Sequence, residues 1–143
     1  MAPDVIFSIC NTAVLPGWLL LAILPRWKWT TRLITSVIIP ALLGCVYLYL
    51  VLTHFSEAEG GFGSLAQVQQ LFQNPFALLG GWIHYLAFDL FIGSWEVRDA
   101  QRLGLNHFLV IPCLALTFLF GPIGLLLYFL LRFAAKKQTL VEN

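Results

Sequence analysis

The sequence predicts an all-α integral membrane protein, a bundle of four transmembrane helices with a short amphipathic interfacial helix between spans two and three. Hydrophobic residues make up 59% of the chain and charged residues only 10%. Apolar stretches of about 20 residues, the length that crosses a bilayer core of about 30 Å, recur along the sequence. We therefore expect one membrane domain over residues 1–143. The spans are expected at about residues 5–24, 31–53, 75–95 and 107–132.

The first two spans carry recognisable signals. Pro25 ends the first span, and the following Arg26–Trp29 segment combines basic and aromatic residues that anchor a helix at a membrane surface. The second span contains Pro40. We expect the hydroxyls of Thr35 and Ser36, about one turn upstream, to satisfy backbone carbonyls that the proline leaves without a donor.

The connection between spans two and three is polar and acidic. Residues 54–64 contain glycine and glutamate but no lysine or arginine, which is typical of a loop on the translocated side. Residues 65–72 place apolar side chains at helical spacing and predict the interfacial helix. Asn74 followed by Pro75 is typical of a helix start, so we expect the third span to begin there.

The fourth span is expected to begin at Asn106 or His107, after a turn at Gly104. The Gly121–Pro122 pair is expected to bend or break it. The tail from residue 134 is polar and is predicted to be frayed. Four spans would place both termini on one side, with five basic residues in the loops of the opposite side and three near the C-terminus.

Composition also excludes several classes of function. The formal net charge is +1 and no basic patch lies outside the short loops, so we expect no nucleic-acid partner. Cys10, Cys45 and Cys113 lie in apolar segments without metal-type spacing and are expected to be buried thiols. The sequence has no glycine-rich phosphate loop, nucleophile elbow or redox cysteine pair.

Two ionisable residues lie inside the third span, His84 and Asp89. An acid at the centre of a membrane helix costs about 2.5 to 3.5 kcal/mol, so such residues indicate function or polar contacts between helices. At about 100° per residue they are about 140° apart, and each should face a different neighbouring helix or opposite walls of one cavity. A protonated Asp89 as acid and a neutral His84 as base are the candidate catalytic residues. The alternative is that they only hydrogen-bond across the bundle.

Other residues are candidates for supporting roles. Aromatic residues of the third span could line a groove for an apolar ligand: Trp82, Tyr85, Phe88, Phe91 and Trp95. Supporting polar residues are expected to be Glu96, Arg98, Asp99, His107 and Asn11. We predict no metal site, because the acidic and histidine side chains fall on different helix faces. Glu96, Arg98 and Asp99 are interpreted as a solvated ion-pair cluster in a loop beside the membrane.

The third span also carries a motif. Trp82-Ile83-His84, Leu86 and Asp89-Leu90-Phe91, with Asp99 further on and Gly121–Gly124 late in the chain, resemble the plant abscisic-acid-deficient membrane proteins associated with neoxanthin synthesis and their bacterial relatives. The resemblance covers essentially the whole chain. Trp82, His84, Asp89 and Asp99 match the motif one by one, whereas Glu96, Arg98 and Gly121 depart from the plant pattern.

The resemblance implies a cofactor-free, redox-neutral isomerisation of a carotenoid or related isoprenoid lipid. In the family this is protonation of an epoxide and loss of a proton from the polyene, which gives an allene and an alcohol. The alternatives are a non-catalytic carotenoid-binding or assembly protein and, less favoured, a proton-coupled transporter. The expected partners are membrane lipid and the isoprenoid ligand, and a homodimer is reasonable. Without an Arg- and Ser-rich extension before the first span, we expect a bacterial inner membrane or a cyanobacterial, thylakoid-type membrane.

Overall fold

The computed structural model describes residues 1–136, and every element in that part of the chain is helical, which confirms the all-α prediction. Residues 137–143, which include most of the predicted polar tail and Lys137, lie outside the described residues. The elements are α1 (Pro3–Ile23), η1 (Thr30–Ile38), α2 (Ile39–His54), η2 (Phe55–Glu57), α3 (Leu65–Leu71), α4 (Pro75–Leu103), α5 (His107–Phe120) and α6 (Pro122–Lys136).

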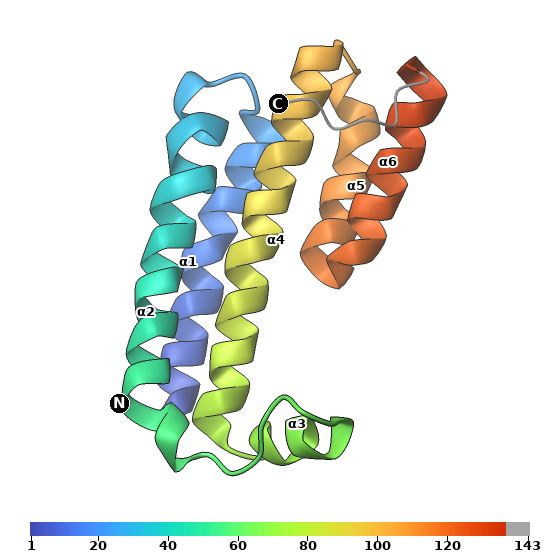
Figure 1. Cartoon of the computed structure of the whole chain (residues 1–143). Helices are drawn as coiled ribbons and strands as arrows, with labels where there is room; N and C mark the ends of the chain where they lie inside the picture. Colours follow the sequence, from blue (N-terminus) through green and yellow to red (C-terminus); the bar gives the residue numbers. More distant parts are fainter. Residues whose placement is uncertain (137–143) are drawn as a thin grey trace.

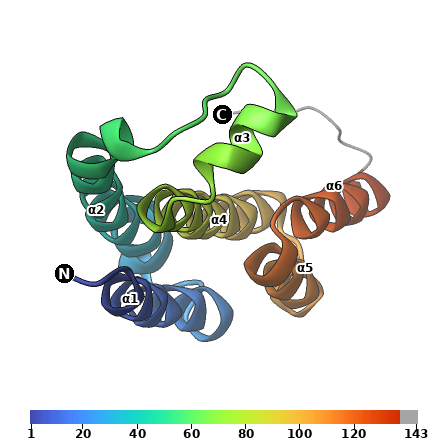
Figure 2. The same ribbon diagram turned by 90° about the horizontal axis from the view of Figure 1, so that it is seen from below.

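Helix α4 is the central element of the fold. Helices α1 and α2 pack on one side of it and α5 and α6 on the other, as Figures 1 and 2 show. Three helical segments are long and apolar enough to cross a membrane: Pro3–Ile23, Thr30–Glu57 and Pro75–Leu103. The first two correspond to the predicted spans one and two. Helix α3 confirms the predicted short helix between spans two and three.

The second span begins as a π-helix, η1, before it continues as α2. The Thr35 hydroxyl donates to the carbonyl of Thr30 at 2.8 Å, and the Ser36 hydroxyl donates to the carbonyl of Thr31 at 2.6 Å. The two hydroxyls thus bond carbonyls of the π-helix, and not the carbonyl one turn before Pro40 that the proline leaves without a donor, so the predicted partners were wrong. Helical irregularities of this kind are tolerated at membrane depth when side chains take the freed hydrogen bonds.

The start of α4 is as predicted, but its end is not. The Asn74 side chain caps the helix by accepting from the backbone N–H groups of Phe76 and Ala77, with Pro75 as the first helical residue. The helix then continues to Leu103, eight residues beyond the predicted end. It stops at Gly104, which has φ +67° and forms the predicted turn. The prediction of a loop after Trp95 was wrong, because no helix-breaking residue stands between Trp95 and Gly104.

The predicted single fourth span over residues 107–132 is not confirmed. The chain reverses at Gly121, so α5 and α6 lie side by side as a helical hairpin, as Figure 1 shows. Each arm has only 14 or 15 residues. At about 1.5 Å per residue, an arm is roughly 21 to 23 Å long, which is shorter than the ~30 Å bilayer core. The expected break at Gly121–Pro122 is therefore a full reversal.

The hairpin changes where the basic residues lie. Helix α6 runs back toward the C-terminal end of α4. Its basic residues therefore lie at the same end of the molecule as those of the α1–η1 connection and of the end of α4 (Figure 1). This contradicts the expected five-against-three division. The basic residues gathered there are Arg26, Lys28, Arg32, Arg98, Arg102, Arg132 and Lys136.

Candidate functional site

The three acidic residues of α4 share one face of the helix. Asp89, Glu96 and Asp99 are separated by seven and three residues, spacings that keep side chains within a narrow sector of a helix. All three contact the α5–α6 hairpin. We call this polar contact zone between α4 and the hairpin the acidic seam.

Asp89 lies at the tip of the hairpin. A Cβ atom on Gly121 would stand only 2.9 Å from the Asp89 Oδ1 atom, so the carboxyl packs directly against the backbone of the reversal. The Tyr85 hydroxyl, one turn earlier on α4, interacts with this carboxyl and donates to the carbonyl of Phe118 at 3.1 Å. The Asp89 Oδ2 atom is buried and has no hydrogen-bond partner among the described residues.

Glu96 occupies the middle of the acidic seam and is completely buried. The Thr117 hydroxyl of α5 donates to its Oε1 atom at 2.9 Å. Its Oε2 atom, like Oδ2 of Asp89, has no hydrogen-bond partner within residues 1–136. The structure thus corrects the interpretation of Glu96 as part of a solvated loop cluster.

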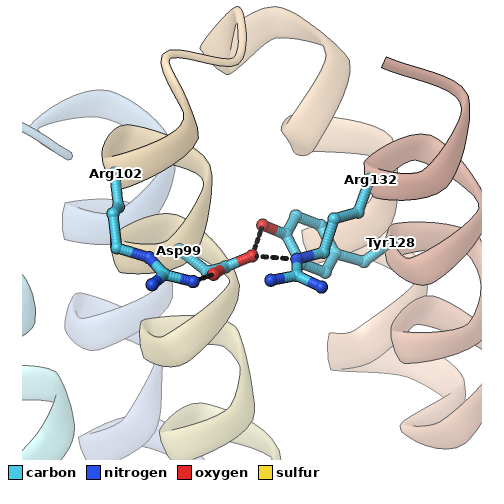
Figure 3. Close-up of polar contacts among 4 residues, drawn as sticks. All are labelled: Asp99, Arg102, Tyr128 and Arg132. Carbon is cyan, nitrogen blue, oxygen red and sulfur yellow. Dashed lines mark hydrogen bonds and ion pairs between the residues drawn. The ribbon is translucent and has the colours of Figure 1, made fainter. Parts of the chain in front are cut away.

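Asp99 forms the most strongly bonded group of the seam, drawn in Figure 3. Its Oδ2 atom accepts from the Tyr128 hydroxyl at 2.7 Å and from Nε of Arg132 at 2.8 Å, and Oδ1 accepts from Arg102 at 2.9 Å. The Arg132 and Asp99 side chains are 1% and 3% exposed. A buried, charge-assisted network of this kind joins the hairpin to α4.

His84 faces the opposite direction, toward α2. Its ring lies 6.2 Å from that of Tyr47 and 4.4 Å from that of Phe88. Two adjoining cavities of about 220 and 320 Å³, both lined by His84 and Tyr47, form an apolar groove between α2 and α4. We call it the His84 groove. Phe88 and Phe91, two of the predicted wall residues, also line it.

A second groove lies between α1 and α4. Two adjoining cavities of about 520 and 290 Å³ share Trp82 and Tyr85 as walls, and we call them together the Tyr85 groove. Phe118, beside the hairpin tip, also lines it. The Trp82 indole N–H donates to the Asn11 side chain at 2.9 Å, which gives Asn11 its predicted role as a polar link between helices. Trp82 and Tyr85 therefore belong to a different groove from Phe88 and Phe91.

The remaining predicted residues bind backbone or pack between helices. Arg98 donates to the carbonyl of Thr31 at 3.1 Å, and Nε2 of His107 lies 2.9 Å from the carbonyl oxygen of Ala22. Trp95 packs against the ring of Tyr128 on α6 rather than in either groove. No group of three metal-ligating side chains occurs among residues 1–136.

Sequence reasoning missed the hairpin residues of the acidic seam. They are Thr117, Gly121, Tyr128 and Arg132. One available signal was the Gly121–Pro122 pair, which was expected to bend or break the span but not to reverse the chain. A polar Thr117 and a basic Arg132 on either side of that break, within apolar helices, would together have indicated that the two arms face the acids of α4.

Fold and site together define a helical protein of membrane type, in which one long helix carries a line of acids against a helical hairpin and forms a wall of two apolar grooves. Comparison with known proteins gives the family. A family model described as ABA DEFICIENT 4-like matches residues 5–128, and the chain belongs to this family. It is 25% identical over 141 residues to the Arabidopsis thaliana protein named "Protein ABA DEFICIENT 4, chloroplastic".

That match covers 93% of this chain and 63% of the Arabidopsis protein, so the chain spans less than two thirds of its relative. No solved structure matches the chain. The family membership confirms the resemblance seen in the third-span motif. Together with the three long apolar helices, it supports association with a membrane.

Proposed function

We propose that this protein binds a carotenoid or related isoprenoid lipid from within the membrane and isomerises it by acid–base chemistry without a redox change. Membership of the ABA DEFICIENT 4-like family supports a carotenoid-related role. The observation that carries the chemistry is the position of Tyr85, whose side chain is a wall of an apolar groove and whose hydroxyl lies at the hairpin tip, against which the Asp89 carboxyl also packs. An apolar wall with few polar groups is what a hydrophobic substrate requires.

Tyr85 and Asp89 together form the proposed proton donor. A proton passes from the Tyr85 hydroxyl to an oxygen of the ligand, and the carboxyl of Asp89 replaces the proton on Tyr85. The oxygen–carbon bond of the ligand then breaks. A neighbouring carbon loses a proton to Tyr85, which at the same time returns its own proton to the Asp89 carboxylate, so both groups end as they began. No electron is gained or lost, so the step needs no cofactor.

His84 is the other candidate and serves a different groove. The His84 groove and the Tyr85 groove lie on different sides of α4. The reacting group of a bound ligand can therefore contact His84 or Tyr85, but not both. His84 remains the proposed base for a ligand that enters between α2 and α4. Variants of the two residues therefore identify the groove that is used.

The test expresses Asp89→Asn, Tyr85→Phe and His84→Ala variants in a carotenoid-producing host and compares pigments by chromatography. Glu57→Gln, an exposed acid outside both grooves, is the matched control for Asp89→Asn. Loss of product in the Asp89 and Tyr85 variants, with retention in His84→Ala, supports the Tyr85 groove. Unchanged products in all three variants, with normal yield and thermal unfolding, would defeat the catalytic proposal.

A second candidate is a non-catalytic pigment-binding protein. It is favoured by one observation: the Asp89 carboxyl packs against Gly121 and lines neither groove. Under this alternative Asp89→Asn lowers the unfolding temperature, while the pigment still copurifies and no conversion is lost.

We also propose a topology, with α1, the η1–α2 segment and α4 as three spans and the α5–α6 hairpin entering the membrane from the basic end. The positive-inside rule then places that end on the cytoplasmic or stromal side, in a bacterial inner or thylakoid-type membrane. Asp4, Glu57 and Glu59 lie toward the other end. A homodimer stays a prediction.

Single cysteines test this topology in a chain whose three native cysteines are replaced. A membrane-impermeant thiol reagent added to one side should label Lys28→Cys and Lys136→Cys from the same side of the membrane. It should label Glu57→Cys only from the other side. A continuous fourth span would instead put Lys136→Cys on the same side as Glu57→Cys, which would overturn the hairpin topology.

A further inference from the structure

Two carboxyl oxygens of the acidic seam lie in the interior of the protein. Oδ2 of Asp89 and Oε2 of Glu96 are both buried without a hydrogen-bond partner in the described part of the chain. Leaving a buried polar atom unpaired costs about 1 to 3 kcal/mol, and more if the group is charged. A pair of such atoms on one helix face calls for a functional reason.

The comparison with Asp99 shows which of the three acids can carry a charge. Asp99 is bonded to two guanidinium groups, so its ionised form is neutralised by Arg102 and Arg132. Asp89 and Glu96 form no ion pair within residues 1–136. An unpaired carboxylate in a dry site is far more costly than a neutral carboxylic acid. Both groups are therefore most stable as carboxylic acids that hold a proton.

The two carboxyls are close enough to influence each other. They are seven residues apart on α4, which is about 10.5 Å along the helix axis. The last turn of α5 closes the space beside both of them. Thr117 at one end of that turn binds Glu96, and Gly121 at the other end packs on Asp89. One water bridges only about 5.5 Å between two oxygens, so proton transfer over this distance requires a chain of waters or rotation of the side chains toward each other.

We propose that Asp89 and Glu96 form a single proton-exchange site enclosed by the hairpin. When Asp89 gives up its proton toward Tyr85, the O–H bond of Glu96 breaks and a new O–H bond forms on Asp89. The negative charge then lies on Glu96, nearer the arginines of the basic end. The reverse transfer restores the resting state, so protons and charge balance. Glu96 acts through Asp89 and is a positioning residue for the proton rather than a catalytic residue.

The titratable and charged groups that face this site come from three elements. Helix α4 contributes Tyr85 and Asp99, and α6 contributes Tyr128 and Arg132. Helix α5 contributes Cys113, whose thiol lies near enough to Glu96 to interact with its charge. Arg132, which is bonded to Asp99, is the nearest fixed positive charge from the hairpin. Glu96 is completely buried and Asp89 only partly, so a charge on Glu96 is the costlier one and is held only transiently.

Infrared spectroscopy of the purified full chain in nanodiscs tests the proton site without any substrate. Neutral carboxylic acids show a carbonyl stretch that shifts in D₂O, and carboxylates do not. At neutral pH, Asp89→Asn and Glu96→Gln should each lower the intensity of this band by the contribution of one carboxylic acid. The double variant should lower it by the contribution of two. Glu57→Gln should remove none, because an exposed glutamate is ionised at that pH. An undiminished signal in Glu96→Gln would overturn the proposal.

Exchange between the two groups has its own readout. In Asp89→Asn the remaining Glu96 band should change position or pH dependence, and an unchanged band would show that the two acids are independent, which also overturns the proposal. Thr117→Val covers the case in which Glu96→Gln fails to fold, since it keeps the acid but removes its hydrogen bond. There the Glu96 band should shift, and an unshifted band would contradict a neutral Glu96 at this place.

The role of this site in turnover rests on the proposed function, whereas the proton site itself does not. In the carotenoid-producing host, Glu96→Gln should lower conversion at least tenfold and Glu96→Asp should restore part of it. Full conversion by Glu96→Gln would show that catalysis does not need the Glu96 proton, which would overturn this role. If the wild-type chain converts no pigment at all, the carotenoid proposal fails, and the infrared result still decides the proton site.

Discussion

Replacement of Gly121 by alanine tests the reversal on which the acidic seam depends. The backbone at Gly121 has φ +49° and ψ −96°, a region that residues with a Cβ atom rarely adopt. Holding alanine there costs about 1 to 3 kcal/mol. The new Cβ atom would also meet Oδ1 of Asp89 at 2.9 Å, but this atom ends a short side chain that can rotate away, so the steric part adds little.

The assay is thermal unfolding of the purified protein in one detergent, followed by tryptophan fluorescence. A loss of about 1 to 3 kcal/mol corresponds to roughly 3 to 10 °C in unfolding temperature for a chain of this size. Gly44→Ala is the matched control, because a Cβ atom on this helical glycine meets nothing within 4 Å. It should be neutral or stabilise by up to about 1 kcal/mol.

The double variant Gly121→Ala with Asp89→Ala separates the two causes. Removing the carboxyl relieves the steric contact but not the backbone strain. Adding Gly121→Ala to Asp89→Ala should therefore lower the unfolding temperature nearly as much as adding it to the wild-type chain. Equal unfolding temperatures for Gly121→Ala and Gly44→Ala would refute the reversal at this residue. They would favour a continuous helix through Gly121 instead.

Two further predictions concern how the hairpin closes and how it attaches to α4. Gly124→Ala should destabilise more than Gly121→Ala, because its Cβ atom would overlap the backbone of Thr117 on the facing arm; an unfolding temperature equal to that of Gly44→Ala would contradict this close approach. Arg132→Gln should cost about 3 to 5 kcal/mol, since it leaves a buried Asp99 with its nearest charge partner removed. Arg102→Gln, whose side chain is 40% exposed, should cost about 1 kcal/mol or less in the same unfolding assay, and equal losses for the two arginines would be evidence against the burial described.

Features that depend on neighbouring residues could be predicted from the sequence. The Asn74–Pro75 cap and the Gly104 turn both follow from residues within about one turn of each other. The opposed directions of His84 and Asp89 followed from helical periodicity alone. Local chemistry of this kind does not require knowledge of the tertiary fold.

Features that depend on distant contacts could not be predicted in this way. The apolar composition of residues 107–132 is the same whether they form one span or two arms, and only the close approach of Gly124 to Thr117 decides for the arms. Similarly, Glu96 and Asp99 were expected in solvent because acids near a span end usually are. Their burial depends on hairpin residues: Thr117, 21 residues beyond Glu96, and Arg132, 33 residues beyond Asp99.

The half-length hairpin explains why a groove exists beside α4 at all. Its tip reaches only to the level of Asp89, where Phe118 accepts the hydrogen bond from Tyr85. A full fourth span would continue past this level and pack over Tyr85 and Trp82, which instead form walls of the groove between α1 and α4. The same reversal that buries the acids in one half of α4 therefore leaves the other half open to an apolar ligand, with Tyr85 at the boundary between them.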